Sequence, residues 1–402
     1  ATNSTVSKIS AALKANSGVS VNVTLSESSE LTSLPDSAFQ SCTSLKTMVL
    51  PDKVYLGEKC FQDCTALTSI NIPASETTIP KRCFKNCSNL VSITIPESVN
   101  SVGVYAFYEC SSLSEVSVPS TVTDFYSGAF SDCTSLSTVN YGGTVEQWCS
   151  IYIENEKANP IYYAESLKIN GKMLTTAVIE TSTKINAYAF YNCQSLTNVT
   201  IGDSVTSIGE DAFYGCTGLT SLTIPNSVTS IDSGAFGGCS NISGTVVLPA
   251  SITSVPYAIF NGCSKITGIT LPEKTTKIGS YAFQTCSSLE TINIPSTITE
   301  IGDAAFRRCS SLTGNFSIPN GVTIINPDTF SECGITSVDI PESVTSIGYG
   351  AFEMSGLTSV NIPDSVTAIG YSAFQNCSAL ESVTLSASLT SISTSLFEGT
   401  KL

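Results

Sequence analysis

The chain has 402 residues, a formal net charge of −15 and no histidine. A surface of this sign repels phosphate backbones, so we expect no nucleic-acid partner and no anionic membrane surface as a partner. Without histidine the commonest general base and the usual serine and cysteine triads are missing, so we predict that the chain is not an enzyme and has no catalytic residues.

The first twenty residues predict an amino-terminal cap. Val6, Ile9 and Leu13 are spaced along one face of a helix, and Gly18 lies just beyond them, so we expect a helix over about residues 4–16. The first ten residues show neither a charged start nor an apolar stretch, so no signal peptide is visible in this chain. No apolar run approaches the ~20 residues that span a bilayer, so we expect no membrane insertion.

From residue 21 onward a single unit recurs about every 23 residues. Its general form is L-x-x-V-x-I-P-x-S-V-T-x-I-G-x-x-A-F-x-x-C-x-x-L, and its phenylalanine returns at steady intervals except for one long gap between Phe130 and Phe190. A fixed period in this range is typical of a solenoid, in which each turn packs against copies of itself. We therefore predict one elongated domain over residues 1–402, with repeats at 21–141 and 187–402.

Each unit predicts two short extended segments and a turn. The V-x-I segment alternates at period two, which indicates a strand with one buried face, and the proline after it ends the strand. S-V-T-x-I is a second extended segment, and the glycine that follows, such as Gly279 or Gly302, is expected to permit a sharp turn. A-F-x-x-C-x-x-L is too short for a full helix, so we expect a turn or a single 3-10 turn. Strands that recur once per turn pair as a parallel sheet, which makes the fold mostly β with little helix.

The phrase from Ile294 to Leu312 resembles the BspA-like class of leucine-rich-repeat surface proteins, and the resemblance covers residues 21–402. It implies a leucine-rich-repeat horseshoe or curved rod, with the parallel sheet on the concave face and short extended or 3-10 segments on the convex side. It also implies secreted or surface-attached proteins, some of them adhesins, with no shared catalytic residues and no shared ligand motif.

Residues 142–186 interrupt the repeat. Thr144 and Gln147 form a capping-box pattern ahead of Trp148, which predicts a short helix. Ala164, Leu167 and Ile169 match the strand pattern, so one strand of the sheet is expected to continue through this segment.

Asn170-Gly171 then predicts a hairpin turn, with the chain returning over residues 173–178. Two interpretations of the interruption stay open. Trp148 fills the space of a missing phenylalanine, or it joins Tyr152, Tyr162 and Tyr163 in a protruding recognition element.

The chain has sixteen cysteines, and thirteen of them stand three residues after a repeat phenylalanine. Cys60 and Cys83 occupy a position that is otherwise mainly alanine, which also indicates a small buried side chain. We predict a column of reduced, buried thiols that act as small hydrophobic groups. A disulfide framework, including a bridge such as Cys60–Cys83, is the alternative. No clustered metal-ligand spacing is present, so we predict no metal and no cofactor.

The candidate binding surface is the concave strand face. Small polar residues stand at the outward strand positions, namely Asn71, Thr94, Ser117, Thr200, Thr223, Thr270, Asn293, Ser317, Asp339 and Asn361. We predict an extracellular or cell-surface binding and adhesion module, which recognises host matrix proteins, other cells or glycans through these positions.

The alternatives are a solubilising face without a ligand and a structural spacer or stalk within a larger surface protein. The sequence predicts no oligomeric state. The edge at Leu402 is expected to be uncapped, which leaves open whether the native protein continues.

Overall fold

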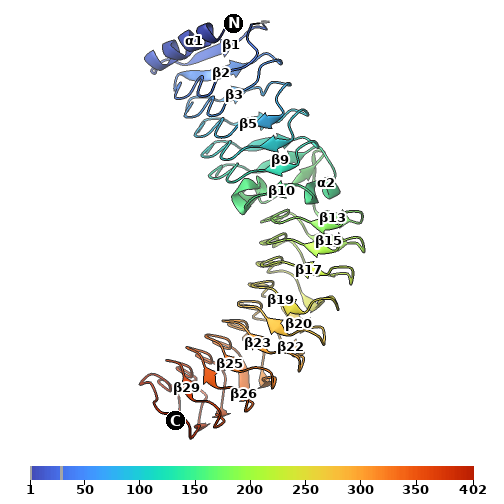
Figure 1. Cartoon of the computed structure of the whole chain (residues 1–402), viewed down its shortest axis with the longest axis vertical. Helices are drawn as coiled ribbons and strands as arrows, with labels where there is room; N and C mark the ends of the chain where they lie inside the picture. Colours follow the sequence, from blue (N-terminus) through green and yellow to red (C-terminus); the bar gives the residue numbers. More distant parts are fainter. Residues whose placement is uncertain (1, 28–29) are drawn as a thin grey trace. The chain divides into compact units, whose positions relative to one another are not determined.

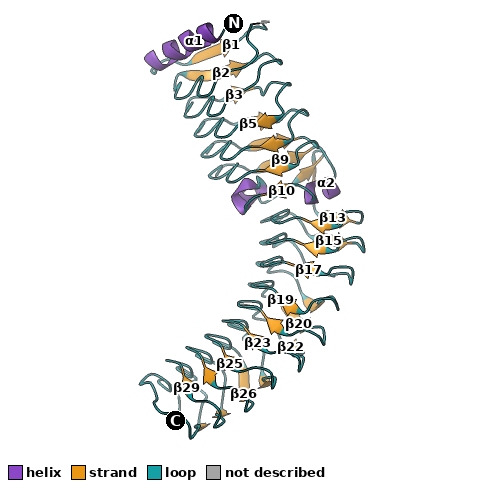
Figure 2. Cartoon of the chain, in the orientation of Figure 1, coloured by secondary structure: helices purple, strands orange, loops and turns teal. Residues whose placement is uncertain are grey.

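The protein is described by a computed structural model, which covers residues 2–27 and 30–402. Contacts divide the chain into two compact units. Unit 1 comprises Ala1–Val178 and Ile185–Leu196, and unit 2 comprises Ile179–Lys184 and Thr197–Leu402. Each unit is a stack of short turns, in which brief strands alternate with loops (Figures 1 and 2). The predicted parallel β-solenoid with little helix is confirmed.

Unit 1 carries two series of strands. The first series, from the V-x-I segments, is β1 (Val21–Thr24), β2 (Leu45–Val49), β3 (Ser69–Ile70), β5 (Ser92–Thr94), β7 (Glu115–Val118), β9 (Thr138–Tyr141) and β11 (Lys168–Ile169). The second series is β4 (Thr78–Ile79), β6 (Ser101–Val102), β8 (Asp124–Phe125) and β10 (Tyr152–Ile153). In the first series β1, β2 and β3 pair in parallel as one sheet, and β5, β7, β9 and β11 pair in parallel as another. The strands of the second series pair in parallel as a single sheet. The helices of this unit are α1 (Asn3–Ala15), α2 (Val145–Cys149), the 3-10 helix η1 (Glu156–Ala158) and α3 (Ile161–Ala164).

Unit 2 repeats the two series. The first is β15 (Asn198–Ile201), β18 (Gly244–Val247), β20 (Ile266–Thr270), β22 (Thr291–Ile292), β24 (Gly314–Ser317), β26 (Ile335–Asp339), β28 (Ser359–Asn361) and β30 (Ser382–Thr384). The second is β16 (Ser207–Ile208), β17 (Ser230–Ile231), β19 (Ser254–Val255), β21 (Lys277–Ile278), β23 (Glu300–Ile301), β25 (Ile324–Ile325), β27 (Ser346–Ile347) and β29 (Ala368–Ile369). β13 (Thr176–Ile179) and β14 (Lys184–Ile185) lie where the two units meet along the sequence.

The expected strand at residues 222–224 is absent. Leu222 and Ile224 are buried and Thr223 is exposed, as the alternation predicts, but the segment lacks the ladder hydrogen bonds of a strand. The alternation of apolar and polar residues therefore determines which side chains are buried. A ladder of backbone hydrogen bonds also requires that the backbone of the neighbouring turn lies within hydrogen-bonding distance.

The amino-terminal helix is confirmed as α1. Its cap is Thr2, whose hydroxyl accepts a hydrogen bond from the backbone N–H of Thr5. Val6 and Leu13 are buried against the first turn, and the Leu13 carbonyl accepts a hydrogen bond from the Ser44 hydroxyl at 2.7 Å. The helix thus covers apolar surface that the first turn has no preceding turn to bury.

The core of each unit is a ladder of phenylalanine rings. In unit 1 the rings from Phe39 to Phe130 stack with centroids 5.2–5.7 Å apart and nearly parallel planes. A second ladder runs from Phe213 to Phe397 in unit 2. Offset stacking of this kind adds to the free energy gained by burying the rings.

The cysteine column lies beside this ladder, and all sixteen cysteines are buried. Thiols of the column donate to the carbonyl oxygen of the phenylalanine one turn earlier, as Cys64 does to Phe39 at 3.0 Å and Cys110 does to Phe84 at 3.1 Å. The predicted burial is confirmed. The thiol also contributes a hydrogen bond between turns, which an alanine of similar size would lack.

The repeat glycine has a different role from the predicted one. Gly279 does not adopt a positive φ angle. A Cβ atom at this position would instead approach the backbone carbon of Pro256, one turn earlier, to 2.7 Å. Glycine is needed here because two successive backbones come close together, and not because the chain turns sharply.

The interruption contains the predicted elements. Thr144 caps α2 with both hydrogen bonds of a capping box, β11 pairs in parallel with β9, and Asn170-Gly171 joins β11 to β12 (Lys172–Met173) as an antiparallel hairpin. The returning strand is shorter than predicted, because Leu174 turns into the core and the chain forms β13 separately.

Trp148 is completely buried, and its ring centroid lies 5.0 Å from that of Tyr141. Its indole N–H donates to the carbonyl of Ala189 at 2.7 Å. In regular turns the corresponding carbonyl accepts from a phenylalanine N–H, as Ala129 does from Phe107 at 2.8 Å. Trp148 therefore supplies both the bulk and the donor that the missing phenylalanine would provide. The interpretation of Trp148 as a core filler is confirmed.

Candidate functional site

The outward side chains of the first strand series form a surface that we call the strand face. Nine of the ten predicted residues on it are exposed, and Ser117 is half-buried. In unit 1 Thr94 pairs in register with Ser117. In unit 2 Ser317 pairs with Asp339, and Thr270 pairs with Val247. The structure thus aligns these side chains in rows within each unit.

Two of the predicted residues already use their side chains in hydrogen bonds to the backbone of the preceding turn. The Asn293 side chain accepts a hydrogen bond from the Leu271 backbone N–H at 2.7 Å and donates to the Leu271 carbonyl at 3.0 Å. Asn71 makes the same pair of bonds with Leu50. These asparagines extend the hydrogen-bond ladder beyond the strand, and they hold neighbouring turns together.

A polar network marks the strand face at β24 and β26. The Asp339 carboxylate accepts hydrogen bonds from the Ser317 hydroxyl and the Asn315 amide, both at 2.6 Å. Ser337 donates in turn to Asn315 at 2.9 Å. The hydrogen bonds from Ser317 and Asn315 favour the ionised form, so they lower the pKa of Asp339 below its ordinary value. This network holds the negative charge of Asp339 among the neutral side chains of Asn315, Ser317 and Ser337.

The strand face of unit 2 is hollowed beside β18 and β20. The hollow has a volume of about 590 Å³ and is lined by Val247, Leu248, Thr270, Leu271 and Asn293, with further loop residues at its rim. Val247 stands where most turns carry a small polar residue, and 57% of its surface is exposed. An exposed apolar side chain in a hollow with polar groups around it is the usual composition of a binding site.

Thr270 and Asn293 were identified from the sequence, whereas the apolar wall of the hollow was not. Val247 departs from the polar pattern of its column, and that departure is the signal for it in the sequence. Leu248 and Leu271 match ordinary core positions, so no sequence pattern marks them as lining residues.

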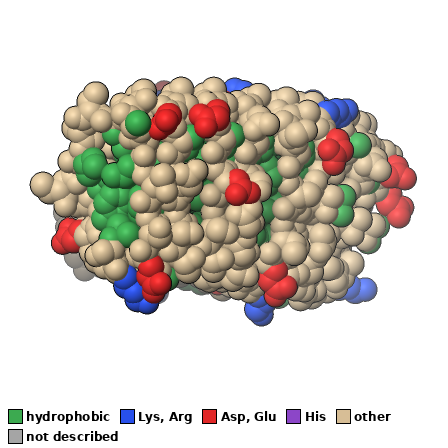
Figure 3. All heavy atoms as spheres, turned by 90° about the horizontal axis from the view of Figure 1, so that it is seen from below, with side chains coloured by type: hydrophobic (Ala, Val, Ile, Leu, Met, Phe, Trp, Pro, Cys, Tyr) green, Lys and Arg blue, Asp and Glu red, His purple; other side chains and the backbone are tan. Residues whose placement is uncertain are grey.

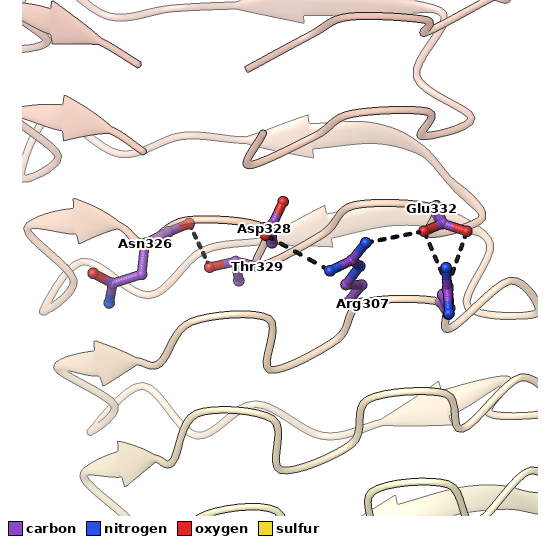
Figure 4. Close-up of polar contacts among 6 residues, drawn as sticks. Arg307, Asn326, Asp328, Thr329 and Glu332 are labelled. Carbon is purple, nitrogen blue, oxygen red and sulfur yellow. Dashed lines mark hydrogen bonds and ion pairs between the residues drawn. The ribbon is translucent and has the colours of Figure 1, made fainter. Parts of the chain in front are cut away.

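The turns of unit 2 carry a separate charged cluster, shown in Figure 4. Arg307 lies between Asp328 and Glu332, with nitrogen–oxygen distances of 3.8 and 3.5 Å, and Arg308 contacts Glu332 at 3.0 Å. Burial raises the pKa of Asp328, and the nearby Arg307 guanidinium partly offsets this increase. Burial also raises the pKa of Glu353. Carboxyl groups with raised pKa values occur at catalytic sites, but ion-pair networks produce them too. Here the cations and carboxylates come from successive turns and form ion pairs with one another, which indicates a link between turns.

The cysteine thiols are the remaining chemistry-bearing groups, and all of them are buried. Burial raises the pKa of the cysteine thiols, to about 12 for Cys60 and Cys110, which suppresses the reactive thiolate. Within residues 2–27 and 30–402, no group of three or more Cys, Asp or Glu side chains is arranged to hold a metal ion. Acidic side chains are scattered over the face shown in Figure 3, some singly and some in adjacent pairs, without forming a continuous charged patch. No helix in the described part of the chain has the length and apolarity to cross a membrane.

Comparison with known proteins identifies similar sequences and folds. The model of the BspA type leucine rich repeat region (6 copies) matches residues 32–159, 183–313 and 310–402. No curated protein matches the chain. The solved leucine-rich repeat protein from Bacteroides ovatus ATCC 8483 is 23% identical, covers 87% of this chain and 92% of its own, and superposes with a TM-score of 0.54.

Two further solved structures are similar at lower TM-scores. A leucine rich cell surface protein from Faecalibacterium prausnitzii A2-165 is 23% identical over 91% of this chain and 88% of its own, with a TM-score of 0.44. A leucine-rich repeat protein from Eubacterium ventriosum ATCC 27560 is 22% identical over 84% and 83%, with a TM-score of 0.49. At these identities the likeness concerns the fold, which the Bacteroides ovatus structure supports.

Proposed function

This chain belongs to the BspA type leucine-rich-repeat family, and from that premise we propose that it is a non-enzymatic module for binding and adhesion at a cell surface. Leucine-rich-repeat proteins are typically non-enzymatic and protein-binding. The resemblance noted in the sequence implies an extracellular setting, and we propose that setting for this chain.

The observation that carries the proposal is the hollow in the strand face of unit 2. It combines the exposed Val247 with Thr270, which lies beside it in register, and with the lysine and glutamate at its rim, Lys274 and Glu273. An apolar centre with a polar surround resembles the energetic core and rim of protein interfaces.

We propose a protein as the ligand of this face. The outward positions of β18, β20, β24, β26 and β28 carry no aromatic ring, whereas sugars are commonly held against aromatic faces. The long rows of Thr, Ser and Asn side chains offer hydrogen bonds over a broad surface, which matches an extended protein partner. The fixed charge of Asp339 adds a preference for a basic group on that partner.

A structural spacer is the second candidate. It is favoured by the asparagine ladder, in which strand-face side chains such as Asn293 hold neighbouring turns together. A spacer and a binding module differ in whether changes on the strand face alter an interaction.

Binding to a panel of immobilised host matrix proteins, measured by biolayer interferometry, tests the proposal. We expect saturable binding by the wild-type chain to at least one of them. The double variant Val247→Arg with Thr270→Arg puts bulk and positive charge into the hollow, so its affinity should fall at least tenfold. The thermal midpoint should stay nearly unchanged, because both side chains point away from the core.

The matched control is Ser230→Arg with Ser254→Arg, which adds the same charge at exposed positions of the second strand series. Its affinity should equal that of the wild type. Absence of binding across the panel would favour the spacer, and equal loss in both double variants would place the interaction outside the hollow.

A further inference from the structure

We propose that a notch on the turn side of unit 1 is a binding site for a neutral saccharide. The notch has a volume of about 300 Å³ and lies between the turn that carries Tyr105 and Tyr108 and the 3-10 helix η1. The notch is separate from the strand face, and the saccharide proposal does not depend on the protein ligand proposed for that face.

The notch exists because two large side chains are followed by two small ones. Hydrogen bonds from Tyr105 N–H to the Ser127 carbonyl and from Glu109 N–H to the Ser131 carbonyl set the register between these turns. In that register Gly128 and Ser131 follow Tyr105 and Tyr108 after one repeat.

The small residue at position 128 is a requirement of the structure. Gly128 has a φ of +60°, and a Cβ atom there would approach the Tyr105 ring to 2.5 Å. A larger residue would therefore displace the ring and close the notch.

The opposite wall is held by side chains of the interruption. Asn155 accepts a hydrogen bond from the Gly128 N–H at 3.3 Å and donates to the Ser127 hydroxyl at 2.8 Å. The Tyr163 hydroxyl accepts from the Asp132 N–H at 2.8 Å and lies 3.2 Å from the Asp132 carboxylate. In regular turns backbone carbonyls fill these roles. The wall is thus fixed to the neighbouring turn before any ligand binds, which reduces the entropy cost of binding.

The aromatic wall is also fixed in place. Tyr105 and Tyr108 pack edge to face with centroids 5.3 Å apart. Arg82 lies 5.8 Å from the Tyr105 centroid and Lys85 lies 4.8 Å from the Tyr108 centroid, both from the preceding turn. These cations lie on one side of each ring, and both rings contribute to the lining of the notch.

The polar lining selects the chemical class of the ligand. The carboxylates of Asp132 and Glu156 are hydrogen-bond acceptors suited to hydroxyl groups. An anionic ligand is disfavoured by the two carboxylates. A cationic ligand is disfavoured by Lys157 in the lining and by the cations behind the rings, Arg82 and Lys85. A neutral ring with one apolar face and several hydroxyl groups satisfies all of these groups, and a pyranose sugar is such a molecule.

Saturation-transfer difference NMR on the full chain tests the assignment. The probes are glucose, galactose, mannose and N-acetylglucosamine, with tetramethylammonium as a cationic probe. We expect signals from the ring protons of at least one sugar and none from tetramethylammonium. The signal should be lost in Tyr108→Ala and in Glu156→Gln, and kept in Tyr108→Phe, which retains the ring.

Tyr349→Ala is the matched control, because Tyr349 is an exposed tyrosine stacked on Tyr371 in the turns of unit 2. It should keep the signal, as should Val247→Arg with Thr270→Arg, which separates this site from the strand face. Circular dichroism checks that each variant is folded. Absence of signal from all four sugars, an unchanged signal in folded Tyr108→Ala, or preference for tetramethylammonium would overturn the assignment.

Discussion

Glu76 provides a sharp test of how the repeat tolerates a polar substitution in its core. Its N–H donates to the Pro73 carbonyl, as the N–H of Val99 does to Pro96 and that of Val122 does to Pro119. Glu76 therefore occupies a position that is valine in the following turns. Only 4% of its surface is exposed, and its carboxylate accepts a hydrogen bond from the Leu56 N–H.

Burial raises the pKa of Glu76 to about 7, although the Leu56 N–H opposes the change. The protonated form is thus favoured in the folded state. The contribution to stability is fully present below the ordinary pKa of 4.5, falls as the pH rises, and is lost above the folded pKa of about 7. At about 1.4 kcal/mol for each pH unit, the loss amounts to roughly 3 kcal/mol.

Glu76→Gln removes the titration and keeps an oxygen that accepts from the Leu56 N–H. Its free energy of unfolding should be close to that of the wild type at pH 4.5 and exceed it by roughly 3 kcal/mol at pH 8. Urea unfolding at several pH values measures this, with fluorescence of the single tryptophan, Trp148, as the reporter for unit 1.

Glu97→Gln, at an exposed position one turn later, is the control, and its free energy of unfolding should stay within about 0.5 kcal/mol of the wild type because the side chain lies at the surface. If the wild type and Glu76→Gln differ by the same free energy at pH 4.5 and pH 8, the inferred pKa of Glu76 is wrong.

Three further outcomes are expected. Denatured protein should react with about sixteen equivalents of a thiol reagent without added reductant. Native protein should react with very few equivalents, because its thiols are buried and have raised pKa values. Fewer reactive thiols in the denatured protein would establish disulfides. Trp148→Ala should lower the free energy of unfolding by roughly 3–5 kcal/mol, measured by circular dichroism in urea, whereas Tyr152→Ala, at a half-exposed side chain, should change it by about 0.5 kcal/mol or less. Asn293→Ala should lower the free energy of unfolding by about 1–3 kcal/mol, because the N–H and the carbonyl of Leu271 lose their hydrogen-bond partner. Equal effects of Asn293→Ala and Thr270→Ala would contradict the structural role of the asparagine hydrogen bonds.

The local predictions from sequence succeeded where one short pattern determines one short element. The capping box at Thr144 and the Asn170-Gly171 turn are examples, because their hydrogen bonds join residues that are neighbours in sequence. The strand face was predicted for the same reason, since alternation within a strand determines which side chains point outward. The hollow beside Val247 was only partly predicted, because its walls come from successive turns about 23 residues apart.

The sequence by itself determined the solenoid, its period, the buried columns of phenylalanine and cysteine, and the places where the pattern is broken. These features follow from side chains that recur at one interval, and each turn must bury its apolar face against a copy of itself. Only the tertiary structure decided what the breaks in the pattern do. The Glu76 carboxylate accepts a hydrogen bond from the Leu56 N–H, and the Trp148 indole N–H donates to the Ala189 carbonyl in place of a backbone N–H. Asn155 lines the notch on the side opposite Tyr105. The physical reason is that hydrogen bonds, electrostatic interactions and cavities depend on which groups stacking brings to the same place, and a periodic pattern specifies the stacking without specifying the partners.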